Sequence, residues 1–436
     1  MKIRYIEIDS YNQFKKLKIN LTYPNGHKKA GQPLDKICII GQSGTGKTTL
    51  LHFIKDVFTL SHTGSYGSYT ITTLNDSTSY VVKANSEGRK TYTIQGQRQR
   101  IDGTNGKTEF ANHINDIDTA LIYLPADFLG MKATDTEPII KRQPNIFDFG
   151  TISVNEIWHR ILDRVREHQG LLKSLRKQIT DLTQKVSGDE MDQKMPPLIK
   201  RLKELEKFDN NPLKNLAKDC LDDILAMFNL KVITDYAHDD DLSSIEFIRI
   251  SDKNGNEIPN GFLSTGTTQF ILSMIPFYVL RPNDTVILFD EPERSLYPDI
   301  QKKLIDHHSN FISNSQLFYA THSPIIASCF DPWEVVELKF NPEGYVYQEP
   351  YFDGKDRHVD NYKVHPKYLT YELILKKIFD VEETEGDSRA ELKTAYKSLE
   401  AKLSMLKKEG NNTGENFDEV LKEYKKLGEL LSWPAN

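Results

Sequence analysis

Two hydrophobic patterns follow one another along the chain. Over the first 124 residues, apolar residues either alternate with polar ones or form short runs, and both patterns predict β-strands. Turn sequences such as Asn-Asp and Asn-Ser-Glu-Gly separate the middle strands, which favours an antiparallel meander. The predicted strands are residues 2–9, 15–22, 36–40, 66–73, 77–83, 90–94 and 120–124.

A helical period replaces this pattern from about residue 157 onwards. Apolar residues then recur at alternating steps of four and three, the spacing of a coiled-coil seam, and His168 occupies one seam position. We interpret His168 as a tolerated seam residue and not as a ligand or pH sensor. The pattern predicts a helical arm over residues 157–187, roughly 45 Å long at 1.5 Å per residue. The apolar seam residues are Ile161, Val165, Leu172, Leu175, Ile179, Leu182 and Val186, and Leu198, Leu202 and Leu205 begin a predicted return helix.

The second half of the chain is predicted to alternate between helices and strands up to about residue 350. Residues 388–407 and 415–431 then carry apolar side chains at helical spacing, and a Gly-Asn-Asn-Thr-Gly sequence joins them. This arrangement predicts a C-terminal helical hairpin. The alternating region begins with an amphipathic helix after Pro212 whose apolar positions are Leu216, Cys220, Ile224 and Phe228.

The composition narrows the class of protein. The chain has 436 residues, a net charge of −6 and 27% charged residues, and its mean hydropathy is −0.52. This charge excludes a surface that is basic all over, so any contact with DNA must use a local patch or a partner. No apolar stretch reaches the roughly 18 residues of a membrane span, and the N-terminus alternates like a strand, unlike a signal peptide. We therefore expect a cytoplasmic protein with no membrane contact.

The three cysteines add no redox or metal chemistry to this picture. Cys38, Cys220 and Cys329 each lie in an apolar stretch, and no C-x-x-C spacing is present. We therefore interpret them as small core residues and not as disulfides or metal ligands.

Residues 41–49 carry the first sequence with a specific chemistry. They read Gly-Gln-Ser-Gly-Thr-Gly-Lys-Thr-Thr, the G-x-x-x-x-G-K-[ST] phosphate-binding loop, between the predicted strand 36–40 and a helix that starts at Gly46. Glycines let the backbone wrap a phosphate, and the helix N-terminus presents free N–H groups. We expect Lys47 to reach the β- and γ-phosphates and Thr48 to bind Mg²⁺. The nucleotide-binding residues are thus Gly41, Gln42, Ser43, Gly44, Thr45, Gly46, Lys47, Thr48 and Thr49.

Two further strands end in residues that suit nucleotide hydrolysis. Residues 285–292 form an apolar strand that ends in Asp290 and Glu291, and residues 316–324 form a second strand that ends at His322. We expect Asp290 to hold Mg²⁺ through water and Glu291 to orient and deprotonate the attacking water. His322 lies where its side chain can hydrogen-bond the γ-phosphate.

The loop that precedes the carboxylate strand gives the first resemblance to a known family. Residues 262–269, Phe-Leu-Ser-Thr-Gly-Thr-Thr-Gln, lead into an apolar helix, and their position resembles the signature motif of ABC-type ATPases. Residues 293–298 then occupy the place of the D-loop. The resemblance implies that ATP and Mg²⁺ bind between two heads, with the phosphate-binding loop of one subunit facing the signature of another. Its implied nucleotide contacts are Ser264, Thr265, Gly266 and Gln269.

Within the ABC-type ATPases, the arm and the motif spacing separate several families. Transporter ATPases have a closer spacing and no arm, whereas long-armed SMC proteins insert hundreds of coiled-coil residues. The opening segment 6–14, the Asp-Glu-Pro-Glu sequence at 290–293 and the Leu-Tyr-Pro step at 296–298 resemble the RecF/OLD-like group of SMC-related ATPases. This sequence departs from the usual motifs at residues 10–12, at Tyr297, where the usual step is Leu-His-Pro, and at Thr265. The Q-loop glutamine stays open among Gln95, Gln97 and Gln99.

This resemblance implies an α/β fold, namely an ABC-type P-loop ATPase head whose mixed sheet has an antiparallel β subdomain. A short helical, coiled-coil-like arm and a C-terminal helical segment complete the chain. The expected domains are an N-terminal lobe with the phosphate-binding loop, the arm insertion, a C-terminal lobe and a helical partner-docking segment. Their bounds are 1–151, 152–212, 213–350 and 351–436.

The tail points to a role in antiphage defence. Residues 352–356, 373–381 and 388–389 are similar to the C-terminal segment of the ATPase subunits of Septu systems (PtuA), including retron-associated relatives, which work beside an HNH nuclease. We recognise no nuclease site in the chain, so the resemblance implies a homodimer or higher oligomer that controls a separate nuclease and reaches DNA through it. The acidic run 382–385 is interpreted as a solvated face.

Three other functions stay open at this point. A PARIS-type ATPase would have a Toprim nuclease as partner in place of an HNH nuclease. A RecF-like DNA-repair ATPase would bind DNA directly across its paired heads. A transporter ATPase would need a membrane partner and a closer motif spacing.

Overall fold

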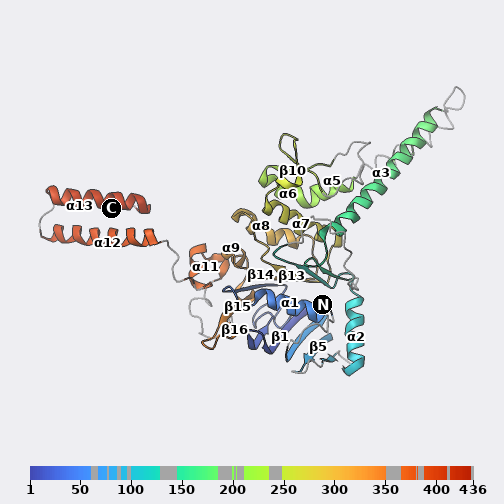
Figure 1. Cartoon of the computed structure of the whole chain (residues 1–436), viewed down its shortest axis with the longest axis horizontal. Helices are drawn as coiled ribbons and strands as arrows, with labels where there is room; N and C mark the ends of the chain where they lie inside the picture. The colour runs from blue at the N-terminus through green and yellow to red at the C-terminus, as the bar shows by residue number, and fades with distance from the viewer. Residues whose placement is uncertain are drawn as a thin grey trace. The chain divides into compact units, whose positions relative to one another are not determined.

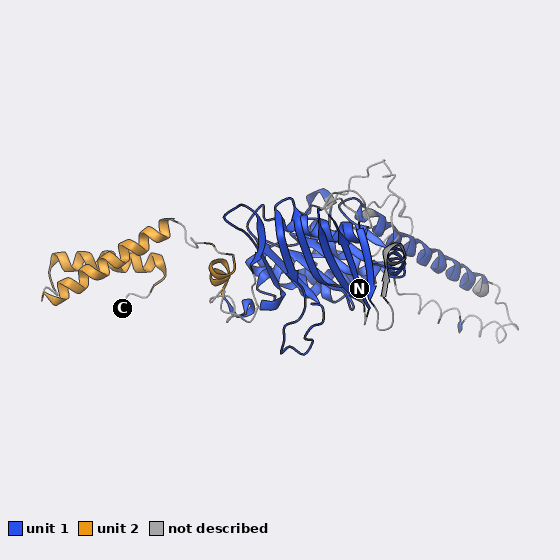
Figure 2. Cartoon of the chain, turned by 90° about the horizontal axis from the view of Figure 1, so that it is seen from below, with its two compact units in different colours: residues 1–369 blue, residues 370–436 orange. Residues whose placement is uncertain are grey.

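The computed structural model describes most of the chain as two compact units, Met1–Leu369 and Thr370–Asn436 (Figure 2). In the described residues, one sheet has 13 strands and a smaller one has three. The described residues are 1–59, 67–75, 78–85, 90–95, 100–127, 145–184, 199–200, 203, 211–234, 248–349, 365–379, 381, 387–409 and 413–433.

One half of the large sheet is parallel and buried. Its strands pair in parallel from β15 through β3, β14, β13 and β8 to β9. The central strands are buried on both faces, which explains their continuous apolar sequences. The bounds are β3 Lys36–Gly41, β8 Leu121–Leu124, β9 Ile146–Asp148, β13 Val286–Asp290, β14 Gln316–Ala320 and β15 Val335–Phe340.

The other half is antiparallel and confirms the predicted meander. It runs in the order β7, β6, β5, β4, β1 and β2, and every pair in it is antiparallel. Strand β16 joins the two halves, because it pairs with β15 in antiparallel and with β2 in parallel. The bounds are β1 Lys2–Tyr11, β2 Phe14–Asn20, β4 Tyr69–Asn75, β5 Thr78–Ala84, β6 Lys90–Gln95, β7 Arg100–Asp102 and β16 Val346–Glu349.

Helix α1, Lys47–Phe58, fills the space between the two halves of the sheet (Figure 1). Its buried side chains belong to one continuous core with apolar residues of both halves, such as Ile6 and Ile71 of the antiparallel half and Leu288 and Phe318 of the parallel half. Burial of these side chains supplies the main driving force that closes the sheet around α1. The helix is therefore fixed by its packing just after the loop that follows β3.

Helices α7, Thr265–Leu280, and α8, Pro298–Ser309, contribute to the core on the opposite face of the parallel strands. His308 of α8 is fully buried there and stacks on Phe289 at a ring distance of 4.4 Å. His308 is therefore not part of a solvated helix face, because the aromatic rings of Phe289 in β13 and Tyr319 in β14 cover it.

The arm begins with helix α3, Val154–Gln184, which confirms a long helix in this region. Its first half is buried at Trp158, Leu162 and Val165, and the helix packs against α7. Beyond residue 165 most of its side chains are exposed, apart from the seam residue Leu175. The predicted return helix cannot be compared, because Leu198, Leu202 and Leu205 lie outside the described residues.

Two helical segments differ from the sequence prediction. Helix α2, Gly103–Asn115, follows β7 and was not predicted. The helix predicted after Pro212 changes its hydrogen-bond pattern three times, and a π-helical turn at Ala217–Leu221, which contains Cys220, precedes the next α-helical turn. Its segments are α5 Pro212–Leu216, η2 Ala217–Leu221, α6 Asp222–Leu225 and η3 Ala226–Phe228, and the small sheet β10 Leu230–Val232, β11 Ile250–Asp252 and β12 Glu257–Ile258 follows.

The remaining elements of the first unit are short. A 3₁₀ turn, η5, precedes α7, and helix α9 follows β14. The three cysteines are free, and Cys38 and Cys220 are buried as expected, whereas Cys329 is half-buried. The short elements are η5 Asn260–Phe262, α9 Pro324–Ala327, η6 Pro332–Glu334 and η7 Pro366–Tyr368.

The second unit contains the predicted C-terminal hairpin. Helices α12, Asp387–Lys408, and α13, Glu415–Leu431, follow a short helix α11, Tyr371–Lys377. The rings of Tyr396 and Tyr424 stack at 4.3 Å in the middle of the hairpin and share a hydrogen bond. Among the described residues, no helix is long and apolar enough to cross a membrane.

Candidate nucleotide site

Three parallel neighbours, β3, β14 and β13, bring the predicted motifs to one edge of the sheet. The registers pair Ile39 with Ala320 and Ala320 with Asp290. Because parallel strands end at the same edge, the phosphate-binding loop, the carboxylates after β13 and His322 after β14 are adjacent. Residues far apart in the sequence thus form a single candidate site.

The phosphate-binding loop adopts a conformation that requires its glycines. Gly44 and Gly46 have φ angles of 85° and 86°, in the left-handed region that favours glycine. A Cβ at Gly46 would lie 2.8 Å from Cζ of Phe14 and would also collide with the side chain of Gln13. Thr45 closes the loop by donating to the carbonyl of Gln42 at 2.8 Å. The loop therefore presents its backbone N–H groups at the start of α1.

Lys47 lies over this loop and is only 6% exposed. Its Nζ donates to the carbonyl oxygens of Gly41 at 3.0 Å and Gln42 at 3.3 Å. Burial lowers the pKa of the ammonium group to about 8, and the charge of Glu291 opposes this effect only in part. Phosphate oxygens can replace these two carbonyl acceptors, and their charge would stabilise the ammonium form.

Thr48 and Asp290 form the candidate Mg²⁺ site. The hydroxyl of Thr48 lies 2.9 Å from each carboxylate oxygen of Asp290. Burial raises the pKa of Asp290, while hydrogen bonds from Thr48 and Tyr123 lower it. Hydroxyl and carboxylate oxygens fit Mg²⁺, which usually takes one or two protein ligands and completes its shell with water and phosphate. No cluster of three or more His, Cys, Asp or Glu suited to a metal occurs within the described ranges.

Glu291 and His322 stand at the open side of the site. The Glu291 carboxylate lies 3.8 Å from Nε2 of His322, and the two side chains are 38% and 40% exposed. Glu291 has a φ of 46°, and its N–H donates to the carbonyl of Ala320 at 2.8 Å, which turns the chain immediately after β13. Burial lowers the pKa of His322, and the nearby charge of Lys47 adds to the effect. Glu291 is thus an accessible proton acceptor beside a neutral imidazole.

The candidate signature residues lie at the start of α7. Ser264 caps α7 by accepting from the N–H of Thr267 at 3.1 Å, and Ser264 and Thr265 are exposed. Gly266 is buried against the carbonyl of Ser295. Among the described residues, no hydrogen bond joins this segment to the phosphate-binding loop.

Gln269 lies about one turn further along α7 and has different contacts. Its Nε2 donates to the carbonyl of Ala126 at 3.3 Å, in the segment after β8. It lines a small cavity that also includes Asp290 and Glu291. Gln269 is thus turned toward the carboxylates of its own chain.

Of the three candidate Q-loop glutamines, Gln95 lies within the described residues. Gln95 ends β6, is exposed and pairs with Ser79 and Arg100 in the sheet. Gln97 and Gln99 lie outside the described residues.

The structure adds two side chains that the sequence did not single out. Tyr123 of β8 contacts Asp290, and its hydroxyl also lies 2.9 Å from Nε2 of His52 in α1. Glu293 is 8% exposed and accepts from Thr321 and from the N–H of His322. In the sequence, Tyr123 is a tyrosine inside an apolar run, and Glu293 is a third acidic residue at the end of the carboxylate strand. Neither pattern predicts which side chain the residue contacts.

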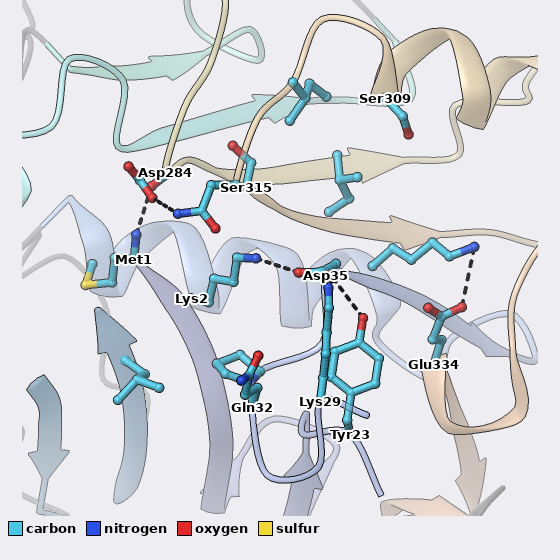
Figure 3. A pocket seen from close by; sticks show the side chains of 16 residues that line it. Met1, Lys2, Tyr23, Lys29, Gln32, Asp35, Asp284, Ser309, Ser315 and Glu334 are labelled. Carbon is cyan, nitrogen blue, oxygen red and sulfur yellow. Dashed lines mark hydrogen bonds and ion pairs between the residues drawn. The ribbon is translucent and has the colours of Figure 1, made fainter. Parts of the chain in front are cut away.

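A larger cavity, of about 720 Å³, lies at the opposite ends of the parallel strands (Figure 3). Its lining includes Lys2, Lys29 and Asp35, and both lysines lie 2.5 Å from that carboxylate. A further ion pair joins Nζ of Lys36 to a carboxylate oxygen of Glu334 at 3.4 Å. The charges around this cavity neutralise one another, and none of the predicted site residues lines it.

Residues 36–328 match the family described as "AAA domain, putative AbiEii toxin, Type IV TA system". The match spans about two thirds of the chain and includes every candidate site residue named above. The chain therefore belongs to this family of P-loop ATPases, and its fold is α/β with a mixed sheet and an antiparallel subdomain.

Similar solved structures include SMC head domains. The SMC head domain from Thermotoga maritima is 13% identical, with a TM-score of 0.39, over 80% of this chain and 99% of that chain. The Smc head domain from Pyrococcus furiosus, with an extended coiled coil and bound to the C-terminal domain of ScpA, is 13% identical, with a TM-score of 0.40, over 80% and 96%. The head domain from Pyrococcus yayanosii, with a coiled coil and joint, is 11% identical, with a TM-score of 0.40, over 80% and 97%. A comparison with curated proteins gave no match.

Proposed function

We propose that this chain binds Mg²⁺ and ATP between two copies of itself and hydrolyses ATP. The main observation is that Lys47, Thr48, Asp290, Glu291 and His322 meet at one edge of the sheet. The signature residues Ser264 and Thr265 are exposed and, among the described residues, share no hydrogen bond with this group. The site of one chain therefore lacks part of the nucleotide contacts that its own sequence predicts.

The chain's own groups suit hydrolysis of a terminal phosphate. The N–H groups of the phosphate-binding loop and Lys47 bind the polyphosphate, and Thr48 and Asp290 would hold Mg²⁺, which would neutralise part of the phosphate charge. Glu291 orients water and accepts its proton, and His322 donates a hydrogen bond to the γ-phosphate. Pre-positioned groups of this kind supply most of the catalysis in phosphoryl transfer.

A second copy supplies the missing side of the site. Ser264 and Thr265 stand exposed at the N-terminus of α7, where a helix presents unpaired N–H groups and a positive dipole end. These groups fit the γ-phosphate bound to another chain. The nucleotide then bridges two heads, and its presence controls whether they associate.

The biological output that we propose is control of a separate nuclease subunit in antiphage defence, with an HNH partner favoured over a Toprim partner. The resemblance of the tail to Septu ATPase subunits supports this role, as does the toxin–antitoxin description of the family. We assign partner docking to the C-terminal segment 351–436, of which α12 and α13 form the described hairpin. We propose four domains with separate roles. Residues 1–151 and 213–350 form the two lobes of the ATPase head, residues 152–212 form the arm, and residues 351–436 dock the partner.

The Lys47→Ala variant tests the proposal. It removes the ammonium group from the phosphates, so we expect loss of ATP binding by calorimetry, of ATP-dependent dimers by light scattering and of nuclease control when the two subunits are combined. The proposal fails if this variant still dimerises with ATP and still regulates the nuclease. Salt-dependent binding of duplex DNA by the wild-type chain alone would instead support the RecF-like alternative.

A further inference from the structure

Glu293 lies beside the proposed machinery but has no role in the mechanism above. Its side chain is 8% exposed, and its Oε1 atom accepts two hydrogen bonds from the segment after β14. The donors are the hydroxyl of Thr321 and the backbone N–H of His322, the latter at 3.2 Å. One carboxylate oxygen therefore fixes the backbone directly at the imidazole that we place on the γ-phosphate.

These two bonds belong to a closed set of hydrogen bonds, which we call the Glu293 circuit. The hydroxyl of Thr321 also accepts from the N–H of Ser323 at 2.8 Å, and the hydroxyl of Ser323 donates to Oε1 of Gln301 at 2.6 Å. Nε2 of Gln301 donates to the carbonyl of Leu296 at 2.8 Å, and the N–H of Leu296 donates to the carbonyl of Glu293 at 3.0 Å. The circuit thus joins the D-loop to the segment after β14.

The D-loop also contacts the signature end of α7. Ser295 is held at a left-handed φ of 61°, and its carbonyl oxygen lies so close to Gly266 that a Cβ there would collide with it. Gly266 follows the exposed Ser264 and Thr265 in the first turn of α7. A displacement at this end of α7 therefore meets the D-loop backbone directly, because no space separates them.

We infer that Glu293 is a positioning residue, which holds His322 in its working orientation and couples it to the signature end of α7. This inference rests on the proposed function and concerns the regulation of the same site. Packed groups and hydrogen bonds that connect two positions without a break are the physical basis of such coupling. When a second copy binds at Ser264, the D-loop and the Glu293 circuit carry that contact to His322.

Two properties of Glu293 support positioning over simple stabilisation of the fold. Its second oxygen, Oε2, is buried and has no hydrogen-bond partner in the part of the chain that the structure describes. An unpaired buried oxygen costs stability that an apolar side chain would not cost. Burial also raises the pKa of this carboxyl group, which reflects the same unfavourable surroundings.

The first test compares ATP hydrolysis and ATP binding in the Glu293→Ala variant. Loss of the acceptor frees the His322 backbone, so we expect kcat to fall by about tenfold or more, since a displacement of about 1 Å can cost a hundredfold. The dissociation constant for ATP should change less than about threefold, because the phosphate-binding loop is untouched. Thr321→Val should act like Glu293→Ala, whereas the matched control Thr321→Ser retains the hydroxyl and should stay near wild type.

The second test places Glu293→Ala in the His322→Ala background. If Glu293 acts through His322, its removal there should change kcat by less than about twofold, because the group that it positions is already absent. A purely structural role would instead lower kcat by the same factor in both backgrounds. Melting temperatures of all variants accompany these measurements.

Each outcome bears on a different claim. Equal losses in both backgrounds, or unchanged kcat in Glu293→Ala, overturn the inference and leave the proposed ATPase intact. A wild-type chain that neither binds nor hydrolyses ATP overturns both. If Glu293→Ala does not fold, the Thr321→Val and Thr321→Ser pair in the same two backgrounds decides the inference.

Discussion

Lys47 and Asp290 are both 6% exposed, and burial moves their pKa values in opposite directions. The pKa of Lys47 falls to about 8, and that of Asp290 rises. In both cases removal from water disfavours the charged form. A bound polyphosphate favours the ammonium ion, and a bound divalent cation favours the carboxylate. The two side chains are therefore arranged to respond electrostatically when nucleotide and metal bind together.

At this residue scale, the affinity for ATP should fall as the pH rises above 8. The free protein loses the proton of Lys47 near its pKa of about 8, so binding at higher pH requires proton uptake. We expect the dissociation constant measured by calorimetry to increase by about fivefold between pH 8 and 9. Lys47→Arg is the control, since its guanidinium stays charged and its profile should be flat. A flat wild-type profile contradicts the prediction.

His308 should make the protein sensitive to acid. Burial lowers its pKa to about 3, below its ordinary value of 6.5, so the folded chain keeps it neutral. Below pH 6.5 the unfolded chain binds a proton that the folded chain does not, and stability is lost at up to about 1.4 kcal/mol per pH unit until pH 3. His308→Phe keeps an aromatic ring on Phe289 and removes the titration.

The measurement for His308 is the melting temperature between pH 7.5 and 4. Wild type and His308→Phe should diverge as the pH falls, with the phenylalanine variant retaining more stability. At pH 7.5 the histidine is neutral in both states, so that comparison reports packing alone. If the melting temperatures of the two proteins fall in parallel, His308 does not cause the loss of stability at low pH.

At the scale of elements, glycine has opposite effects on stability in helices α1 and α3. Gly46 caps α1 at a φ of 86° and is enclosed by Phe14 and Gln13, whereas Gly170 lies inside α3 with nothing near its Cβ position. Glycine is therefore required at the start of α1 and costs stability within α3. The same residue type marks a functional constraint in one helix and a weak point in the other.

A pair of alanine variants tests this contrast. Gly46→Ala should lose ATP binding, because the new Cβ collides with Phe14 and forces the loop open. Gly170→Ala should stabilise α3 by about 0.5–1 kcal/mol and slow hydrogen exchange of its amides, with ATP binding unchanged. Normal ATP binding by Gly46→Ala, or faster exchange in Gly170→Ala, would contradict these expectations.

At the scale of the whole molecule, we predict that two chains share each nucleotide site, with the phosphate-binding loop from one and the exposed signature residues from the other. Lys47→Ala and Ser264→Arg damage different sides of the proposed shared site, so each variant alone should be inactive. In a symmetric dimer, an equimolar mixture should regain about a quarter of the wild-type ATPase rate, because half of the dimers are mixed and each has one intact site. The measurement is the rate of phosphate release.

The control for this mixing experiment is a chain that carries both substitutions. Combined with Lys47→Ala, it cannot form an intact site and should restore nothing. If the two single variants form mixed dimers but regain no activity, the site is not shared between chains in the proposed way.

The sequence by itself determined the local features of this protein. The apolar runs, the helical periods of α3 and of α12 and α13, and the glycine spacing of the phosphate-binding loop follow from rules that act over a few residues. The order of P-loop, carboxylate strand and histidine strand also indicated which residues would meet. These predictions succeed because side-chain period and backbone conformation are encoded locally.

Only the tertiary structure decided the contacts between distant elements. It buried His308, brought Tyr123 to Asp290 through the pairing of β8 with β13, and placed Glu293 on the segment that carries His322. It also turned Gln269 toward its own chain. Strand order and helix packing depend on the burial of surfaces that are far apart in the sequence, and no local pattern records which strand becomes the neighbour of another.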